Sequence, residues 1–176
     1  MPLLAPEARS RILLRTLAGL QVGVLGGMLM LAWFAIHSLA LGQPWYAMPN
    51  LLGSTFFGEL AFRSGAGRVT AAGMALHLCA SGCIGVAFGL VAPAKSALSP
   101  LRALLLGLLA GLLWYYLLFD LFWRMVNPWV PLYSSHRTML IAHLIYGAGL
   151  SRWRAVFGSM QGQSFEQAAV TEPRCP

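Results

Sequence analysis

Charged residues are scarce in this sequence. Lys, Arg, Asp and Glu make up 10% of its 176 residues, whereas they make up about a quarter of a typical soluble domain. Hydrophobic residues reach 58%, and the mean hydropathy is +0.68. This composition excludes a water-soluble globular domain, so the solvent of the chain is expected to be a lipid bilayer.

The signatures of common enzyme and nucleic-acid sites are also missing. The sequence has no G-x-S-x-G, P-loop, H-E-x-x-H or aspartate dyad, and no RNP, zinc-finger or basic-region pattern. We therefore predict no catalytic residue, do not favour an enzyme, and do not expect nucleic acid as a partner. Twelve basic against five acidic residues give a net charge of +7, which we interpret as a topology signal and as contact with lipid headgroups.

Long apolar runs are abundant. Three runs, residues 17–41, 69–92 and 103–124, each reach the roughly 20 residues that a helix needs to cross the hydrocarbon core. A fourth is expected over 137–158, because Arg152 and Arg154 can extend to the interface and let the helix continue. The predicted fold is an all-α integral membrane protein with four transmembrane helices in an antiparallel bundle.

Basic residues give the predicted orientation. Four crossings place eight Lys and Arg on one side and four on the other, and the richer side is expected to be cytoplasmic. The first side includes Lys95 in the short connection between the second and third helices, and Arg174 near the end. We predict a multi-pass protein of the bacterial inner membrane with both termini in the cytoplasm: a basic N-terminus (1–16), a membrane domain (17–158) and a flexible tail (159–176).

Only two acidic residues, Glu59 and Asp120, fall between residues 17 and 158. The first external loop contains an amphipathic stretch, about 49–62, that is expected to lie in the interface as a short helix. Within it, Glu59 and Arg63 have the i,i+4 spacing of an ion pair, as do Asp120 and Arg124 at the end of the third helix. Helical angles turn Asp120 away from the bundle, where it could contact another subunit.

Small residues recur every four positions, the spacing that lets membrane helices pack closely. These residues fall in the half of each helix that is predicted to be cytoplasmic, while large aromatic residues occupy the other half. The implied bundle is narrow at its cytoplasmic end and open at its external end, which is filled by the protein's own rings and first loop, or by a pigment, haem, quinone or lipid. The predicted packing positions are Gly19, Gly23, Gly27, Ser81, Gly85, Gly89, Gly107, Gly111 and Gly147.

The stretch VTAAGMALHLCASGCIG (69–85) resembles a metal motif at first sight. At about 100° per residue, however, Cys79 and Cys83 lie about 200° and 240° from His77, so the three cannot ligate one metal. With Cys175 near the end of the chain, three cysteines also make no disulfide framework. No metal site is predicted here.

Three histidines are predicted to point into the bundle at similar depth. His77 shares a face with Ser81 and Gly85, while His37 and His143 each lie within about 40° of a packing glycine on their own helix. Inward histidines on different helices are what the axial ligation of haem b requires, with His77 and His143 as the best pair and His37 as a further candidate ligand of haem or a pigment. Another metal, or plain interhelical hydrogen bonds, are the alternatives.

Together these patterns favour a small non-catalytic integral subunit of a larger respiratory or photosynthetic electron-transfer complex. Its role would be structural or cofactor-supporting, and its partners would be membrane lipids and other integral membrane subunits. Two alternatives stay open. One is a b-type haem protein with bis-histidine ligation that acts with quinone, and the other is a small transporter or lipid-handling protein.

Overall fold

The structure, a computed structural model, describes residues 6–93 and 99–171, with side chains over 8–93 and 99–162. This part of the chain is helical and contains no strand. The predicted connection around Lys95, and Arg174 and Cys175 in the predicted tail, lie outside the described residues. The elements are α1 (Pro6–Ala40), α2 (Ala47–Phe57), α3 (Leu60–Arg63), α4 (Arg68–Val91), α5 (Pro100–Tyr115), the π-helix η1 (Tyr116–Phe122), α6 (Trp123–Val126), α7 (Trp129–Tyr133), α8 (His136–Leu150) and α9 (Trp153–Thr171).

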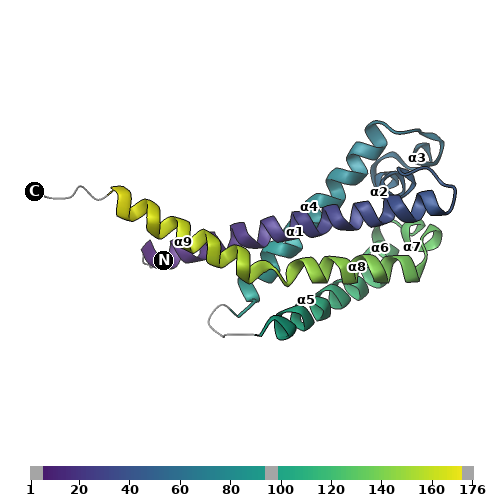
Figure 1. The fold of residues 1–176 in the computed structure, drawn as a ribbon. Coiled ribbons are helices and arrows are strands. Elements are labelled where there is room, and N and C mark those ends of the chain that lie inside the picture. Colours follow the sequence, from purple (N-terminus) through teal and green to yellow (C-terminus); the bar gives the residue numbers. More distant parts are fainter. Residues whose placement is uncertain (1–5, 94–98, 172–176) are drawn as a thin grey trace, which may run out of the picture.

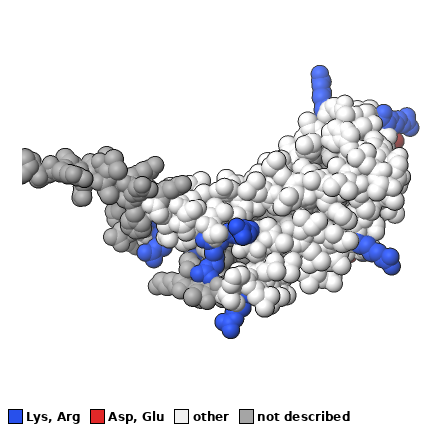
Figure 2. Space-filling model, viewed as in Figure 1, with Lys and Arg blue, Asp and Glu red and all other residues white. Residues whose placement is uncertain are grey.

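Three helices are long and apolar enough to cross a membrane: Ala8–Ala40, Arg68–Val91 and Pro100–Val126. Basic side chains lie toward the two ends of the molecule, with an uncharged band between them (Figure 2). Such a band is the surface that a hydrocarbon core would cover. The chain is therefore an all-helical protein with the features of a membrane protein.

The segment 137–158, predicted as one helix, is divided in the structure. α8 has 15 residues, which span about 22 Å, less than the roughly 30 Å of a hydrocarbon core. Ser151 and Arg152 form a turn, in which the Arg152 amide bonds to the carbonyl of Gly149 (3.1 Å) and the Ser151 hydroxyl donates to the carbonyl of Ala148 (2.6 Å). These i→i−3 bonds tighten and end the helix.

α9 then continues to Thr171, over most of the segment predicted to be a flexible tail. The sequence from 153 to 171 contains no proline, so nothing removes a backbone donor from the helix. The polar composition of this segment is typical of a flexible tail, but it does not by itself prevent a helix from forming.

The long helices pack in the order α4, α1, α8, α5. α1 lies against both α4 and α8, and α8 lies against α5, whereas α4 and α5 do not pack closely. Figure 1 shows α2, α3, α6 and α7 gathered at one end of the molecule, called here the loop end, and the start of α1 together with α9 at the other, called here the tail end.

Close glycine contacts join these helices in two antiparallel pairs. A Cβ added to Gly85 on α4 would lie 2.3 Å from the carbonyl oxygen of Gly19 and 2.6 Å from the Cα of Gly23, both on α1. A Cβ on Gly147 of α8 would lie 2.5 Å from the carbonyl oxygen of Gly107 on α5. The nine predicted packing positions all lie in one of these two contacts, where any larger residue would force the backbones apart.

The predicted interfacial segment (49–62) is not one helix. Gly58, with φ of +57°, ends α2 and separates it from α3, because only glycine adopts this conformation without strain. The first half of α2 is buried against α4, where a Cβ on Gly73 would overlap the carbonyl oxygen of Pro49. α2 is thus a packed part of the loop end, with Phe56 and Phe57 left exposed.

One of the two predicted ion pairs forms. Arg124 lies 3.3 Å from Asp120, and this is the one ion pair among the residues that the structure describes. Glu59 instead lies in the turn between α2 and α3, and it does not pair with Arg63.

Two buried asparagines fasten the loop end. Asn50 donates through Nδ2 to the carbonyl of Ser64 (2.9 Å), and its Oδ1 accepts a hydrogen bond from the Thr70 hydroxyl (2.6 Å). Asn127 donates through Nδ2 to the Ser54 hydroxyl (2.8 Å). Each asparagine satisfies backbone or hydroxyl groups from a different segment, so α2 is tied both to the loop that follows it and to the end of α6.

Arg15 closes the tail end. Its guanidinium donates to the carbonyls of Gly89 (2.9 Å), Leu90 (2.8 Å) and Ala92 (2.5 Å) at the end of α4. It also lies over the ring of Trp153, 5.4 Å from the ring centroid. The cation thus satisfies carbonyls that have no helical partner and joins α1, α4 and α9.

Candidate functional site

A cavity of about 160 Å³ lies in the loop-end half of the molecule. α4 forms one wall, and α5 with η1 forms the opposite wall, so the cavity occupies the space where these two helices do not pack together. The lining is mostly apolar and rich in aromatic rings and methionine, with two histidines. It includes Met30, Phe34, Met48, Leu52, Leu76, His77, Ala80, Ser81, Trp114, Leu118, Phe119, Phe122, Trp123, Met139, His143 and Tyr146.

His143 is a buried polar residue of α8 that lines this cavity, with 8% of its surface exposed. Its Nδ1 donates to the carbonyl of Met139, one turn earlier, over 2.8 Å. Its Nε2 has no protein partner. Among the described residues, every fully buried polar side-chain atom has a hydrogen-bond partner, so an atom without one is not fully buried. The Nε2 atom is therefore accessible, and the space that this ring lines is the cavity.

His77 approaches the same cavity from α4. Its Nε2 donates to the carbonyl of Gly27 on α1 over 3.1 Å, which leaves Nδ1 without a protein partner. The ring packs edge-on against Phe34, with centroids 6.2 Å apart. The structure thus brings His77 and His143, from α4 and α8, to one cavity.

His37 lies elsewhere. Its Nε2 and the Thr138 hydroxyl are 3.0 Å apart, and it lines a separate pocket of about 390 Å³ nearer the loop end. Phe34, Met48 and Met139 line both spaces and form the partition between them. Of the three predicted candidate ligands, two share a site and the third sits beyond this partition.

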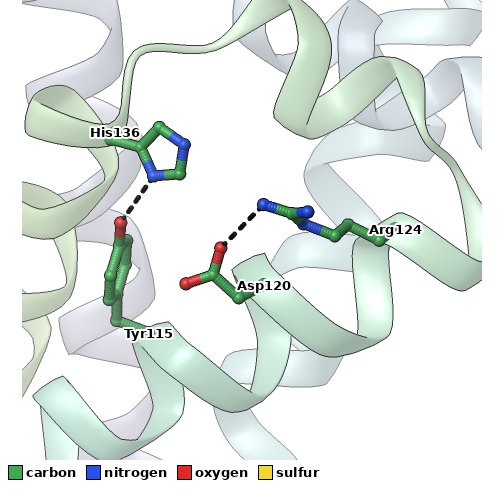
Figure 3. A network of polar contacts seen from close by, with 4 residues as sticks. All are labelled: Tyr115, Asp120, Arg124 and His136. Atoms are coloured by element: carbon green, nitrogen blue, oxygen red, sulfur yellow. Dashed lines mark hydrogen bonds and ion pairs between the residues drawn. The ribbon is translucent and has the colours of Figure 1, made fainter.

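A polar cluster lies beside the cavity on the surface of the loop end. Figure 3 shows Tyr115 bonded to Nδ1 of His136 (2.9 Å), with the Asp120–Arg124 ion pair next to it. Asp120 keeps 33% of its side chain exposed. The structure therefore pairs Asp120 with Arg124 and places it near Tyr115.

The π-helix η1 changes the helical angles of the residues that follow its start, including Asp120. A π-helix bonds i to i+5 and so places an extra residue in the turn, which rotates every later side chain. The same segment turns Phe119 inward, where it is 1% exposed and lies 5.5 Å from the ring of Tyr115 and 5.0 Å from that of His136. Phe119 and Phe122, both of η1, line the cavity.

The cysteines of the 69–85 stretch lie apart from its histidine. Cys79 and Cys83 are exposed free thiols on the outer face of α4, while His77 faces α1 and the cavity. Within residues 6–93 and 99–171, no group of three or more His, Cys, Asp or Glu side chains could hold a metal ion.

Several site residues were missed by the sequence reasoning. Met30, Met48 and Leu52 line the cavity, but ordinary apolar residues in apolar helices give no signal of a cavity. Gly26 and Gly149, at the contact of α1 with α8, and Gly53 and Gly73, at the contact of α2 with α4, also went unnoticed. Gly26, Gly53 and Gly149 fall outside the four-residue series of small residues, and Gly73 is separated from the series of its helix by His77.

These observations define the class: an all-helical chain with three helices suited to a membrane and an aromatic, histidine-bearing cavity. Comparison of the chain with protein-family models, with curated proteins and with solved structures finds no match among any of them. The function must therefore be argued from the site alone.

Proposed function

We propose that four helices cross the membrane as an antiparallel bundle: α1, α4, α5 with η1, and α8 extended by the start of α9. In support, α8 is packed between α1 and α5, and its Ala142 and Leu150 are fully buried. A helix covered by protein on two sides can cross with fewer apolar residues than one surrounded by lipid, and the start of α9 supplies the remaining length. The tail end would lie in the cytoplasm of a bacterium, in accordance with its greater share of arginines.

Reporter fusions test this topology. A fluorescent protein that folds only in the cytoplasm, fused after Gly158, should be bright, and one fused in the loop after Gly65 should be dark. The opposite pattern for the Gly158 fusion alone would leave α8 outside the membrane and contradict the four-helix arrangement.

We infer further that the chain is a non-catalytic integral subunit of a larger electron-transfer assembly of the membrane, and that its cavity holds a small apolar molecule. The observation that carries this proposal is the cavity itself, in which two imidazole nitrogens have no protein partner among aromatic walls. Mostly apolar pockets with a few convergent polar groups are typical of small-molecule sites. In such an assembly the occupant would be a quinone-class molecule, a pigment or a lipid.

Purification in a mild detergent tests the proposal. The complex should retain other integral membrane polypeptides, and solvent extraction followed by mass spectrometry should release one dominant apolar molecule in near-stoichiometric amount. A chain that is isolated alone, monomeric and without any such molecule would contradict both parts of the proposal.

A haem b site is the second candidate, and one observation favours it. Histidines that ligate metals commonly donate their other ring nitrogen to a carbonyl, as His143 does to Met139. His77 has an equivalent bond, from Nε2 to the carbonyl of Gly27. The size of the cavity weighs against haem: about 160 Å³ is below the roughly 300–1,000 Å³ of typical ligand pockets, so it suits a single ring better than a haem. A sharp α-band in the visible spectrum of the reduced protein, lost in His143→Ala, would establish this candidate.

A transporter or lipid-handling role has less support. It calls for a path that continues from the cavity to the tail end, past Gly23 and Gly85. There the backbones of α1 and α4 touch so closely that a single added Cβ on Gly85 would lie 2.6 Å from the Cα of Gly23. A path along this contact would require the two helices to separate.

A further inference from the structure

The hydrogen bonds of the two cavity histidines determine which nitrogen carries the proton. A backbone carbonyl can only accept, so the nitrogen that faces it must be N–H. In His143 this nitrogen is Nδ1, bonded to Met139, and in His77 it is Nε2, bonded to Gly27. The tautomers are thus assigned from fixed partners on the backbone.

Each ring therefore keeps one acceptor nitrogen without a protein partner. In a neutral imidazole one nitrogen donates and the other accepts, so Nε2 of His143 and Nδ1 of His77 are lone-pair acceptors. No Asp or Glu of the described residues lines the cavity, and an imidazolium without an anionic partner is costly in apolar surroundings. The rings are accordingly neutral, and both belong to residues that line the cavity.

The other polar groups of the lining complete this pattern. The Tyr146 hydroxyl donates its proton to the carbonyl of Ser81 over 2.5 Å. Toward a ligand, its oxygen can therefore only accept. Trp114 and Trp123 carry indole N–H groups without protein partners. A hydroxyl group suits this lining, because it can donate to an imidazole nitrogen and also accept from an indole N–H.

The aromatic walls of the cavity favour a ligand in which this hydroxyl is attached to an aromatic ring. Rings of Phe34, Trp114, Phe119, Phe122, Trp123 and Tyr146 surround the space. Aromatic pairs gain from edge-to-face and offset stacking beyond the burial of area alone. A flat ring with a hydroxyl substituent therefore matches both the shape and the hydrogen bonding of the cavity.

We propose that this cavity selects apolar molecules with a phenol-type hydroxyl, the reduced hydroquinone form of a quinone pair being one, and that His143 and His77 accept the hydroxyl proton. This inference rests on the proposed function, since it names the chemical class of the apolar occupant. A quinone carbonyl can only accept, so it could pair with an indole N–H but would leave the imidazole nitrogens without a donor. The site thus prefers the reduced partner of such a pair.

The test is a ligand series on the full-length protein in mild detergent. Trimethylhydroquinone, its dimethyl ether and trimethylbenzoquinone share a ring and differ in hydrogen-bond donors. Titration calorimetry under anaerobic, reducing conditions, with a separate oxidised run for the quinone, should give the hydroquinone an affinity at least about tenfold above that of the ether and the quinone.

A pair of variants assigns the effect. In His143→Phe the preference for hydroquinone over ether should fall below about threefold, since a lost buried partner costs roughly a factor of ten. Cys79→Phe, which changes an exposed residue on the outer face of α4 away from the cavity lining, should keep the full preference. The ligand series on the unaltered protein needs no variant to fold, so it remains decisive if His143→Phe is unstable.

The outcomes separate the two proposals. Equal binding of all three compounds, or tightest binding of the quinone, would overturn the hydroxyl inference while leaving an apolar binding cavity in place. Absence of binding by all three, together with no apolar molecule extracted from the purified protein, would overturn the proposed binding function itself.

Discussion

Replacing Gly85 with alanine should destabilise the α1–α4 pair strongly. The added Cβ would lie 2.3 Å from the Gly19 carbonyl oxygen and 2.6 Å from the Cα of Gly23, whereas unstrained contacts between such atoms begin at about 3.5 Å. The helices must therefore separate by about 1 Å. Since both contacts are to backbone, no side-chain rotation can relieve them.

The cost follows from two terms. Overpacking of a close contact typically costs about 1–3 kcal/mol. Separation of the helices also lengthens the bond from His77 to the Gly27 carbonyl, now 3.1 Å, and an interhelical hydrogen bond in a membrane is worth about 0.6–1.7 kcal/mol. The expected loss is therefore about 2–5 kcal/mol in the free energy of unfolding.

Unfolding in mixed micelles of increasing SDS mole fraction, followed by tryptophan fluorescence, measures this loss. Gly82→Ala is the matched control three residues away: its Cβ would meet the Leu20 Cδ1 at 2.9 Å and the Val24 Cγ2 at 3.4 Å, the movable ends of side chains. Both variants gain up to about 1 kcal/mol in helix propensity, so their difference isolates the backbone contact. Equal stabilities of the two variants would refute the reasoning.

Three further predictions concern other parts of the molecule. Arg15→Ala should lower the free energy of unfolding by about 1–3 kcal/mol, because it uncaps three carbonyls at the end of α4, and Arg15→Lys should recover part of this; a thermal melt with no change in either would contradict the capping role. Asn50→Leu should speed proteolysis within residues 58–67, whose carbonyls it releases, with cleavage elsewhere unchanged. Cys79 and Cys83, both exposed on α4 within a span, should resist a water-soluble maleimide in intact membranes and react after solubilisation in SDS, because the thiolate that reacts does not form in hydrocarbon; labelling of either thiol in intact membranes would contradict α4 as a crossing helix.

Three of the four predicted spans are helices long and apolar enough to cross, because a hydrocarbon core imposes a minimum apolar length. The expected segment 69–92 and the observed helix Arg68–Val91 differ by one residue at each end. The small-residue series was also readable, because close backbone approach excludes side chains wherever it occurs. Which helix each series would meet was not readable, since Gly23 carries no information about whether Gly85 or Gly147 lies opposite.

Features that depend on a single residue or on a distant partner escaped the sequence. The π-helix at 116–122 inserts one residue into a turn without changing hydropathy, so it redirects Asp120 and Phe119 unnoticed. The turn at Ser151 arises from i→i−3 hydrogen bonds. A serine can form such a bond in many positions, so its presence in the sequence does not predict where a helix ends. Which nitrogen accepts in His77 and His143 depends on the backbone carbonyls of Gly27 and Met139. Every residue has a backbone carbonyl, so only the fold shows which carbonyl meets each ring.

The order α4, α1, α8, α5 makes the molecule two hairpin-like halves joined along α1 and α8. The two helices of each half are held together by their own glycine contact. The cavity lies between the halves, and Tyr146, whose hydroxyl donates to the Ser81 carbonyl, lines one side of it. A molecule bound in the cavity contacts both halves and adds to the interactions that hold them together. Its release would loosen the joint while leaving each half intact, so occupancy of the cavity should set how rigidly the two halves are coupled.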